Sequence, residues 1–237
     1  MYKEKIQVTS NDVDQNLELR LSSLFKFMQQ VASNHCESVK VGHWELFKHN
    51  LLWVVIRTEV KIYRTPILDE VITVTTHPGK THSFVYPRYF EIYDSKGKLI
   101  ISSSSMWAMI DKNTRRVVLK PEGIKEIKAE VDKNDLPLPE KIAGEAPYKV
   151  EDRKVRYTDI DLNGHLNNTQ YIEFILDTHD AEFYKSHRLC GINVNYDKEI
   201  KSGDVVSLFS NGKTPEIIKG MVGEVNHFTA LVEYEKR

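Results

Sequence analysis

Residues 17–39, LELRLSSLFKFMQQVASNHCESV, and the later stretch 53–63, WVVIRTEVKIY, decide the fold class of this chain. In the first stretch apolar residues recur three or four positions apart, which is the spacing of one face of an α-helix. In the second stretch apolar and polar residues alternate, as they do along a half-buried strand. We therefore predict a helix over about Ser22–Val39 and a strand over Val54–Tyr63.

Further strands follow the first one, and each is bounded by turn-forming residues. Their predicted ranges are Val71–Thr76, Ser83–Tyr93 and Leu99–Ile110, and Asp94-Ser95-Lys96-Gly97 is typical of a hairpin turn. A long helix followed by strands that hairpins connect is an α+β pattern, because crossover helices are missing.

The same order of elements recurs in the second half of the chain, which indicates an internal duplication. The sequence aligns Asp14 with Asp159 at an offset of 145 residues, and Asp69 with Gly203 at an offset of 134. We predict an N-terminal domain over residues 1–120, a linker over 121–147 with a helical turn at Ile124–Val131, and a C-terminal domain over 148–237. The elements predicted in the second half are a strand at Val150–Thr158, a helix at Asn163–Lys185, and strands at Gly191–Tyr196, Val205–Ser210, Glu216–Val225 and Phe228–Tyr234.

Composition excludes several classes of protein. The 237 residues include 33 Lys and Arg against 34 Asp and Glu, so a net charge of -1 gives no electrostatic basis for general nucleic-acid binding. No apolar run has the length of a membrane helix, and the first residues do not form a signal peptide, so we expect a cytoplasmic protein. Cys36 and Cys190 suggest neither a disulfide framework nor a zinc site, and we expect no metal.

Functional side chains are densest at residues 158–168, TDIDLNGHLNN, where the predicted second helix begins. Free backbone N–H groups at a helix start can hold a carbonyl oxygen that becomes negative during attack. Gly164 would let a substrate approach the backbone closely. The alternative is that the Asp and Asn residues only cap the helix.

Residues 161–168, with Tyr171-Ile172 following, resemble the active-site signature of the acyl-ACP thioesterases. The stretches 51–57, LLWVVIR, and 106–116, MWAMIDKNTRR, resemble two strands of the same family, and the resemblance covers about residues 3–235. It implies an α+β fold of two tandem hotdog domains, each a long helix wrapped by an antiparallel sheet. It also implies hydrolysis of a fatty acyl thioester of acyl carrier protein, with no dissociable cofactor. The first domain would then line the acyl-chain tunnel, with Phe25, Phe27, Met28, Trp44 and Trp53 as candidates.

The resemblance carries the family's catalytic residues to Asp161, Asn163, His165 and Glu199. Many plant members have a Cys after the Glu, where this chain has Ile200, so a thiol mechanism is disfavoured. We expect Glu199 to activate water within hydrogen-bond or one-water reach of Asn163 or His165. His165, oriented by Asp161, would shuttle the proton to the leaving thiolate.

Asn163 and the backbone N–H groups near Gly164 would hold the carbonyl. Two alternatives stay open at this point: a covalent route in which Asp161 attacks the carbonyl, and a merely solvated Glu199. Under the offset of 145, Asn163, Gly164 and His165 fall on Glu18, Leu19 and Arg20, and Glu199 falls near Thr65. We therefore predict one active site per chain.

Two basic clusters could steer an acidic carrier protein, although solvated surface charge is the plain alternative. They are Arg115-Arg116 in the first half and Arg153, Lys154 and Arg156 in the second. The resemblance names acyl carrier protein as the substrate partner and allows a homodimer; no nucleic-acid or membrane partner is expected. The rival functions are an acyl-CoA thioesterase of the same fold and a non-catalytic module that binds acyl groups or carrier protein.

Overall fold

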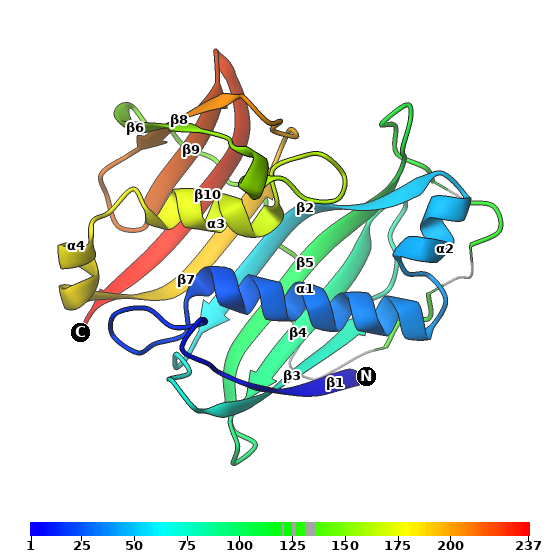
Figure 1. The fold of residues 1–237 in the computed structure, drawn as a ribbon, viewed down its shortest axis with the longest axis horizontal. Coiled ribbons are helices and arrows are strands. Elements are labelled where there is room, and N and C mark those ends of the chain that lie inside the picture. Colours follow the sequence, from blue (N-terminus) through cyan, green and yellow to red (C-terminus); the bar gives the residue numbers. More distant parts are fainter. Residues whose placement is uncertain (120, 125–126, 131–135) are drawn as a thin grey trace. The chain divides into compact units, whose positions relative to one another are not determined.

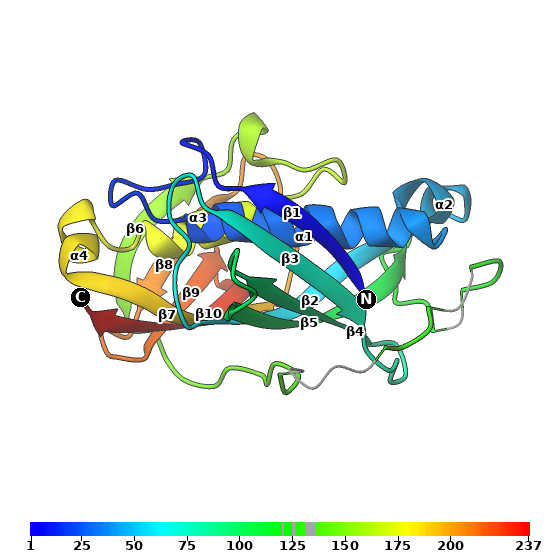
Figure 2. The ribbon, with the colours of Figure 1, turned by 90° about the horizontal axis from the view of Figure 1, so that it is seen from below.

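The computed structural model describes residues 1–119, 121–124, 127–130 and 136–237. The chain divides into two compact units, Met1–Pro139 (unit 1) and Glu140–Arg237 (unit 2). In each unit helices lie on one face of an antiparallel sheet (Figures 1 and 2). The α+β class that the hydrophobic periodicity predicts is therefore confirmed.

The sheet of unit 1 has the strand order β1-β3-β4-β5-β2, with antiparallel pairing throughout. The long helix α1 lies across this sheet (Figure 1). The elements are β1 (Tyr2–Gln7), α1 (Leu21–Ser38), α2 (His43–Lys48), β2 (Leu51–Ile62), β3 (Val71–Pro78), β4 (Tyr86–Tyr93) and β5 (Leu99–Asp111).

The core of unit 1 lies between α1 and its sheet. Leu24, Met28 and Val31, spaced as one helix face, are at most 3% exposed, and Ile72 and Val74 of β3 are fully buried. Burying each such side chain contributes roughly 1.5–3 kcal/mol, which is why the apolar stripe of α1 fixes its orientation on the sheet. The helical periodicity in the sequence thus predicts both the helix and the face that it buries.

The aromatic residues proposed for an acyl tunnel have different environments. Phe25 is buried on α1, and Trp53 is partly buried on β2 with its Nε1–H donating to the Val41 carbonyl at 3.2 Å. Trp44 is 74% exposed on α2 and packs edge-on against Phe47, so it does not line the interior of unit 1. That part of the prediction is wrong, because the short helix α2 turns this side chain outward.

Unit 2 repeats a helix-on-sheet arrangement with the strand order β7-β10-β9-β8-β6, again antiparallel. Ile172 and Ile175 of the helix α3, which are fully buried, supply its apolar face. The elements are β6 (Tyr148–Lys154), η1 (Tyr157–Asp159), α3 (Asn168–Leu176), α4 (Ala181–Ser186), β7 (His187–Tyr196), β8 (Val205–Ser210), β9 (Glu216–Val222) and β10 (Val225–Lys236).

The predicted helix over residues 163–185 is wrong in its start and in its continuity. The α3 helix begins only at Asn168, where the side chain of Asn167 caps it by accepting from the Thr169 N–H at 2.9 Å. The helix ends at Leu176, and Asp180 caps a separate helix, α4, by accepting from the Phe183 N–H. Local capping by Asn and Asp side chains therefore divides what hydrophobic periodicity predicts as one helix.

Other boundaries differ less from the predicted ranges. The strand β8 coincides with the prediction, whereas β7 begins at His187, before the predicted Gly191. The periodicity does not predict β1 or α2. In β1, which lies at a sheet edge, the three consecutive charged residues Lys3, Glu4 and Lys5 hide the strand pattern. The helical turn predicted at 124–131 lies partly outside the described residues, and 127–130 have no regular structure.

Candidate functional site

A closed turn at residues 161–165, called here the Asp161 turn, holds most of the residues that the sequence singled out. The Oδ1 atom of Asp161 accepts hydrogen bonds from the N–H groups of Asn163 at 2.8 Å and His165 at 3.3 Å. The Asp161 N–H donates to the His165 carbonyl at 2.8 Å, and the Gly164 N–H donates to the Asp161 carbonyl at 3.0 Å. These bonds fix the backbone on both sides of the His165 side chain.

The Asp161 turn is attached to the segment that follows β7. The Leu166 N–H donates to the Ile200 carbonyl at 2.8 Å, and His165 forms a β-bridge with Lys201. The side chains of Leu166 and Ile200 are 2% and 0% exposed, so both segments are anchored in the core of unit 2. This pairing is the physical reason why residues far apart in the sequence, His165 and Glu199, meet.

The imidazole of His165 contacts the carboxylate of Glu199, with 3.3 Å between Nε2 and Oε2. The His165 side chain is 17% exposed and that of Glu199 is 39% exposed. The imidazole is therefore mostly buried, whereas the carboxylate is accessible to water. The distance lies within the reach that we expected. The carboxylate therefore has a defined partner, in contrast to the alternative of a merely solvated residue.

His227 holds the backbone of the Glu199 segment. Its Nδ1 lies 3.1 Å from the Glu199 carbonyl oxygen, and its own carbonyl accepts from the N–H groups of Asp197 and Lys198. No sequence motif points to His227, which lies near the start of β10. The signal that could have found it is the antiparallel pairing of β7 with β10, which brings Phe228 opposite Tyr196.

The backbone of the Asp161 turn corrects the predicted carbonyl site. The N–H groups of Asn163, Gly164 and His165 all donate to oxygen atoms of Asp161. In this conformation the Gly164 N–H does not serve as an oxyanion donor, and the turn precedes the first residue of α3 instead of beginning a helix. Within the turn, the partly exposed Asn163 carries a side-chain amide that can donate a hydrogen bond to a substrate.

Tyr171 of α3 lies beneath this region and is 3% exposed. Burial raises the pKa of its phenol, a hydrogen bond with the Ile200 backbone acts in the opposite direction, and the nearby Asp161 charge raises the pKa further. The ring packs edge-on against Tyr196 and Phe228, at 5.2 Å between centroids in both cases. Tyr171 therefore supports the base of the site as a neutral group.

The two thiols lie in environments that disfavour the reactive thiolate. Burial raises the pKa of Cys36, partly offset by the guanidinium of Arg88, whose Nη2 lies 3.2 Å from the sulfur. Burial and the charges of Glu235 and Glu233 raise the pKa of Cys190. Because the thiolate is the nucleophilic form, both environments agree with the expectation that catalysis does not use a thiol.

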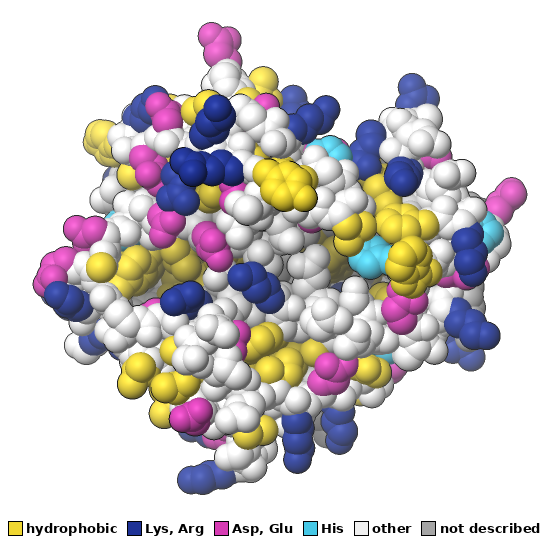
Figure 3. All heavy atoms as spheres, viewed as in Figure 1, with side chains coloured by type: hydrophobic (Ala, Val, Ile, Leu, Met, Phe, Trp, Pro, Cys, Tyr) yellow, Lys and Arg dark blue, Asp and Glu magenta, His cyan; other side chains and the backbone are white. Residues whose placement is uncertain are grey.

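The residues predicted to dock a carrier protein differ in how much charge they present. Arg153 on β6 is paired with Asp177 at 2.9 Å and Glu151 at 3.6 Å, and its guanidinium lies over the ring of Phe174. Lys154 and Arg156 are exposed, and Lys and Arg side chains gather over β6 in Figure 3. In unit 1, Arg115 and Arg116 lie in the turn after β5, whose closure uses the Asp111 backbone.

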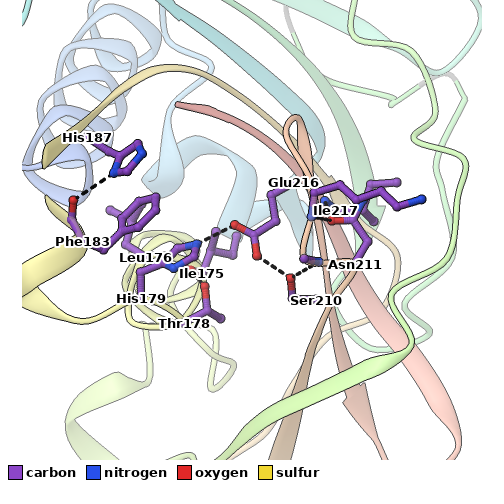
Figure 4. Close-up of polar contacts among 12 residues, drawn as sticks. Ile175, Leu176, Thr178, His179, Phe183, His187, Ser210, Asn211, Glu216 and Ile217 are labelled. Carbon is purple, nitrogen blue, oxygen red and sulfur yellow. Dashed lines mark hydrogen bonds and ion pairs between the residues drawn. The ribbon is translucent and has the colours of Figure 1, made fainter. Parts of the chain in front are cut away.

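A second polar cluster, which the sequence analysis did not identify, lies where α3 ends (Figure 4). His179 Nε2 is 2.6 Å from Oε2 of the buried Glu216, and the Ser210 hydroxyl donates to the other carboxylate oxygen. Burial acts to raise the pKa of Glu216, but the hydrogen bonds from His179 and Ser210 outweigh it and the pKa is lowered. This cluster ties the end of α3 to β8 and β9.

Unit 1 contains a turn with the same hydrogen bonds at residues 14–18, called here the Asp14 turn. Asp14 Oδ1 accepts from the N–H groups of Asn16 at 2.8 Å and Glu18 at 3.1 Å. The Asp14 N–H donates to the Glu18 carbonyl at 2.8 Å, and the Leu17 N–H donates to the Asp14 carbonyl at 3.1 Å. These bonds match Asp14 with Asp161, at an offset of 147 residues, so the predicted offset of 145 is wrong.

The neighbouring segment of unit 1 matches as well. The Leu19 N–H donates to the Pro66 carbonyl at 2.8 Å, as Leu166 does to Ile200 in unit 2. The donors differ by 147 residues and the acceptors Pro66 and Ile200 by 134. The corrected register places Asn16, Leu17 and Glu18 at the positions of Asn163, Gly164 and His165, and it places Thr65 at that of Glu199. The Asp14 turn therefore keeps the aspartate and the amide, and it lacks the imidazole and the partner carboxylate.

Two kinds of feature are absent from the part of the chain that the structure describes. No group of at least three His, Cys, Asp or Glu side chains there could hold a metal ion. No helix among the same residues is both long and apolar enough to cross a bilayer.

Two family models match the chain: the acyl-ACP thioesterase N-terminal domain over residues 1–127 and the C-terminal domain over residues 144–231. The chain is 26% identical to oleoyl-acyl carrier protein thioesterase 2, chloroplastic, of Arabidopsis thaliana, over 94% of this chain and 66% of that protein. It is 25% identical to the acyl-[acyl-carrier-protein] hydrolase FATB3 of Cuphea viscosissima, over 86% of this chain and 53% of that protein. The chain thus spans between about half and two thirds of the length of these plant proteins.

Solved structures resemble the whole chain. An acyl-ACP thioesterase from Bacteroides thetaiotaomicron superposes with a TM-score of 0.84 at 26% identity, covering 98% of this chain and 97% of that one. The 12:0-ACP thioesterase of Umbellularia californica has a TM-score of 0.83 at 22% identity, covering 100% and 97%. These likenesses confirm the predicted hotdog-type fold.

Proposed function

Because the chain belongs to the acyl-ACP thioesterase family, we propose that it hydrolyses the thioester between a fatty acyl chain and the phosphopantetheine arm of acyl carrier protein. The observation that carries this proposal is the contact of 3.3 Å between His165 and Glu199. A module that only binds acyl groups or carrier protein does not need a histidine in contact with a water-accessible carboxylate. The contact therefore favours an enzyme over the non-catalytic alternative.

The proposed reaction begins with attack of water on the thioester carbonyl. Glu199, the more exposed partner, accepts a proton from that water as the new C–O bond forms. The side-chain amide of Asn163 donates to the carbonyl oxygen, which carries the negative charge of the tetrahedral intermediate. Collapse of the intermediate breaks the C–S bond and leaves a free fatty acid and a thiolate.

His165 is suited to return the proton. Its Nε2 faces the Glu199 carboxylate, so the proton taken from water can pass to the imidazole and then to the leaving thiolate. The proton taken from water thus ends on the thiol, and no metal or redox group is required. Passing a proton from Glu199 to His165 requires the two side chains to lie within hydrogen-bond reach of each other, which is the chemical reason for their contact.

Acyl carrier protein is the proposed carrier, and acyl-CoA is the rival substrate. The relatives named above act on acyl-ACP by their names, and the exposed Lys154 and Arg156 offer positive charge to an acidic carrier. Arg116 is the exposed candidate in unit 1. Comparing kcat/KM on one acyl chain carried by acyl carrier protein and by CoA distinguishes the two; a higher value on the CoA ester would overturn the choice of carrier.

The decisive experiment is free-thiol release from a panel of acyl-ACPs with the wild-type protein and with Glu199→Gln and Glu199→Ala. We expect both variants to lower kcat by about 100- to 10,000-fold, the usual range for lost general acid–base catalysis, with little change in KM. Glu199→Gln is the sharper variant, since the amide keeps the shape of the side chain and does not take a proton.

Glu224→Gln is the matched control, because Glu224 is an exposed carboxylate in the turn between β9 and β10. It should behave as wild type. Normal turnover by Glu199→Gln with an inactive His165→Ala would assign water activation to another group. A wild-type protein without turnover on any acyl-ACP would overturn the proposed function itself.

A further inference from the structure

One oxygen of the Asp161 carboxylate, Oδ1, is hydrogen-bonded to the backbone of its own turn. This atom accepts from the N–H groups of Asn163 and His165, the two residues whose side chains are proposed to act on the substrate. Short Asp side chains that accept from N–H groups a few residues ahead are a common means of closing a turn. Asp161 thus has a structural task that is complete before any substrate binds.

Unit 1 shows that this task is independent of chemistry. Asp14 makes the same contacts to Asn16 and Glu18, although the Asp14 turn has neither the imidazole nor the partner carboxylate. If the aspartate served only as a nucleophile, its contacts would not be expected in the Asp14 turn, which lacks the other catalytic side chains. Their recurrence indicates that the aspartate specifies the turn.

We propose that Asp161 is a positioning residue, which closes the turn so that His165 faces Glu199, and that it does not form a covalent bond with the acyl group. This inference rests on the proposed function and decides between two roles that the sequence leaves open. The backbone N–H and carbonyl of His165 are both bonded to Asp161, so the direction of its imidazole follows from the Asp161 contacts.

The covalent route makes a different chemical demand. The Asp161 carboxylate would attack the acyl carbon, form an anhydride and expel the thiolate, and water would then cleave the anhydride to return the carboxylate and release the fatty acid. Two N–H groups that donate to Oδ1 withdraw electron density from the carboxylate, which weakens it as a nucleophile. Direct attack by water needs no such step, because Glu199 already contacts His165.

The test compares Asp161→Asn with Asp161→Ala. The amide oxygen of Asn occupies the place of Oδ1 and accepts the same N–H donors, whereas Ala removes the acceptor. A positioning role predicts that Asp161→Asn lowers kcat by less than about tenfold. Asp161→Ala should lower kcat by roughly 100-fold, the cost of misplacing a reacting group by about 1 Å, while KM changes little.

Asp14→Asn and Asp14→Ala are the matched controls. Asp14→Ala should lower the thermal midpoint about as much as Asp161→Ala does, because the lost contacts are the same, and it should leave kcat near the wild-type value. Trapping with hydroxylamine and intact-mass measurement during turnover should reveal no acyl adduct on the wild-type protein.

An Asp161→Asn variant as inactive as Asp161→Ala, or an acyl adduct on Asp161, would overturn the positioning role. Either result requires a wild-type protein that turns over acyl-ACP, so it leaves the proposed function in place. A wild-type protein inactive on every acyl-ACP would instead remove the reaction on which this inference rests.

Discussion

The Asp14 turn of unit 1 and the Asp161 turn of unit 2 share their backbone hydrogen bonds and differ in the side chains that they present. Where unit 2 has His165, unit 1 has Glu18, and where unit 2 has Glu199, unit 1 has Thr65. The fold therefore needs the turn in both units, and the proposed chemistry needs two side chains in one of them. Both units have the turn, and one of them has the histidine and the partner glutamate, which is consistent with a single active site per chain.

The middle of the two turns differs as well. Gly164 has φ of +81° and a Cβ added there would meet no atom within 4 Å, so the backbone is open to close approach. Leu17 at the matching position has φ of +62° and a side chain that is 55% exposed. Unit 1 therefore carries an exposed leucine side chain, in a strained backbone conformation, at the position where unit 2 has no side chain.

The largest expected effect comes from making the Asp161 turn resemble the Asp14 turn. His165→Glu should lower kcat by about 100- to 10,000-fold, because the imidazole that we propose to relay a proton is replaced by a second carboxylate beside Glu199. The turn should survive, since its bonds to residue 165 use backbone atoms. Acyl-ACP turnover and the thermal midpoint are the measurements. A variant with near-normal kcat would mean that His165 is not part of the reaction.

Glu216 tests the far end of α3, away from the Asp161 turn. Glu216→Ala should lower the free energy of unfolding by about 3–5 kcal/mol, because it leaves His179 without its buried partner. Urea unfolding measures this loss, with Glu224→Ala as the exposed control. A loss below about 1 kcal/mol, the range of exposed ion pairs, would show that the pair contributes little.

The same group predicts a dependence of stability on pH. The folded-state pKa of Glu216 is lowered, so its stabilisation is fully present above the unfolded-state pKa of about 4.3 and is lost as the pH falls through the folded-state value. The difference in unfolding free energy between wild type and Glu216→Gln should therefore shrink in acid. A difference that stays constant from neutral pH down to acid would contradict the lowered pKa.

Gly164→Ala makes the Asp161 turn more similar to the Asp14 turn, which has a side chain at this position, and we expect a smaller effect on stability and kinetics. A side chain at positive φ costs roughly 1 kcal/mol, and the added Cβ meets no neighbouring atom, so the loss of stability should be of that size. If substrates approach over this residue, KM for acyl-ACP should also rise. A large loss of stability with unchanged kinetics would show that the glycine serves the fold alone.

The smallest effect is expected from the thiols, one in each unit. Cys36→Ser combined with Cys190→Ser should keep most of kcat, and iodoacetamide should not abolish turnover, because both thiol pKa values are raised and the residue that follows Glu199 is Ile200. Inactivation by alkylation that substrate prevents would place a thiol in the reaction.

Local pattern predicted the elements better than their ends. Helix α1 and strand β8 follow from periodicity, since side-chain spacing alone determines which face is buried. The predicted start of α3 is too early, because the Asp and Asn residues at 161–165, which are typical of helix caps, close a separate turn before the helix begins. The offset of 145 pairs Asp14 with Asp159, whereas the hydrogen bonds pair Asp14 with Asp161. The two halves share few identical residues, and these do not determine the hydrogen-bond register.

By itself the sequence determined the α+β class, the duplication, the four candidate residues and the family, because periodicity and motif are properties of residue order. Tertiary structure decided that Asp161 binds backbone, that the Gly164 N–H is already engaged, and that Glu199 reaches His165. The physical reason is the pairing of Leu166 with Ile200: two buried residues from distant parts of the chain bring together two polar side chains that no local pattern relates.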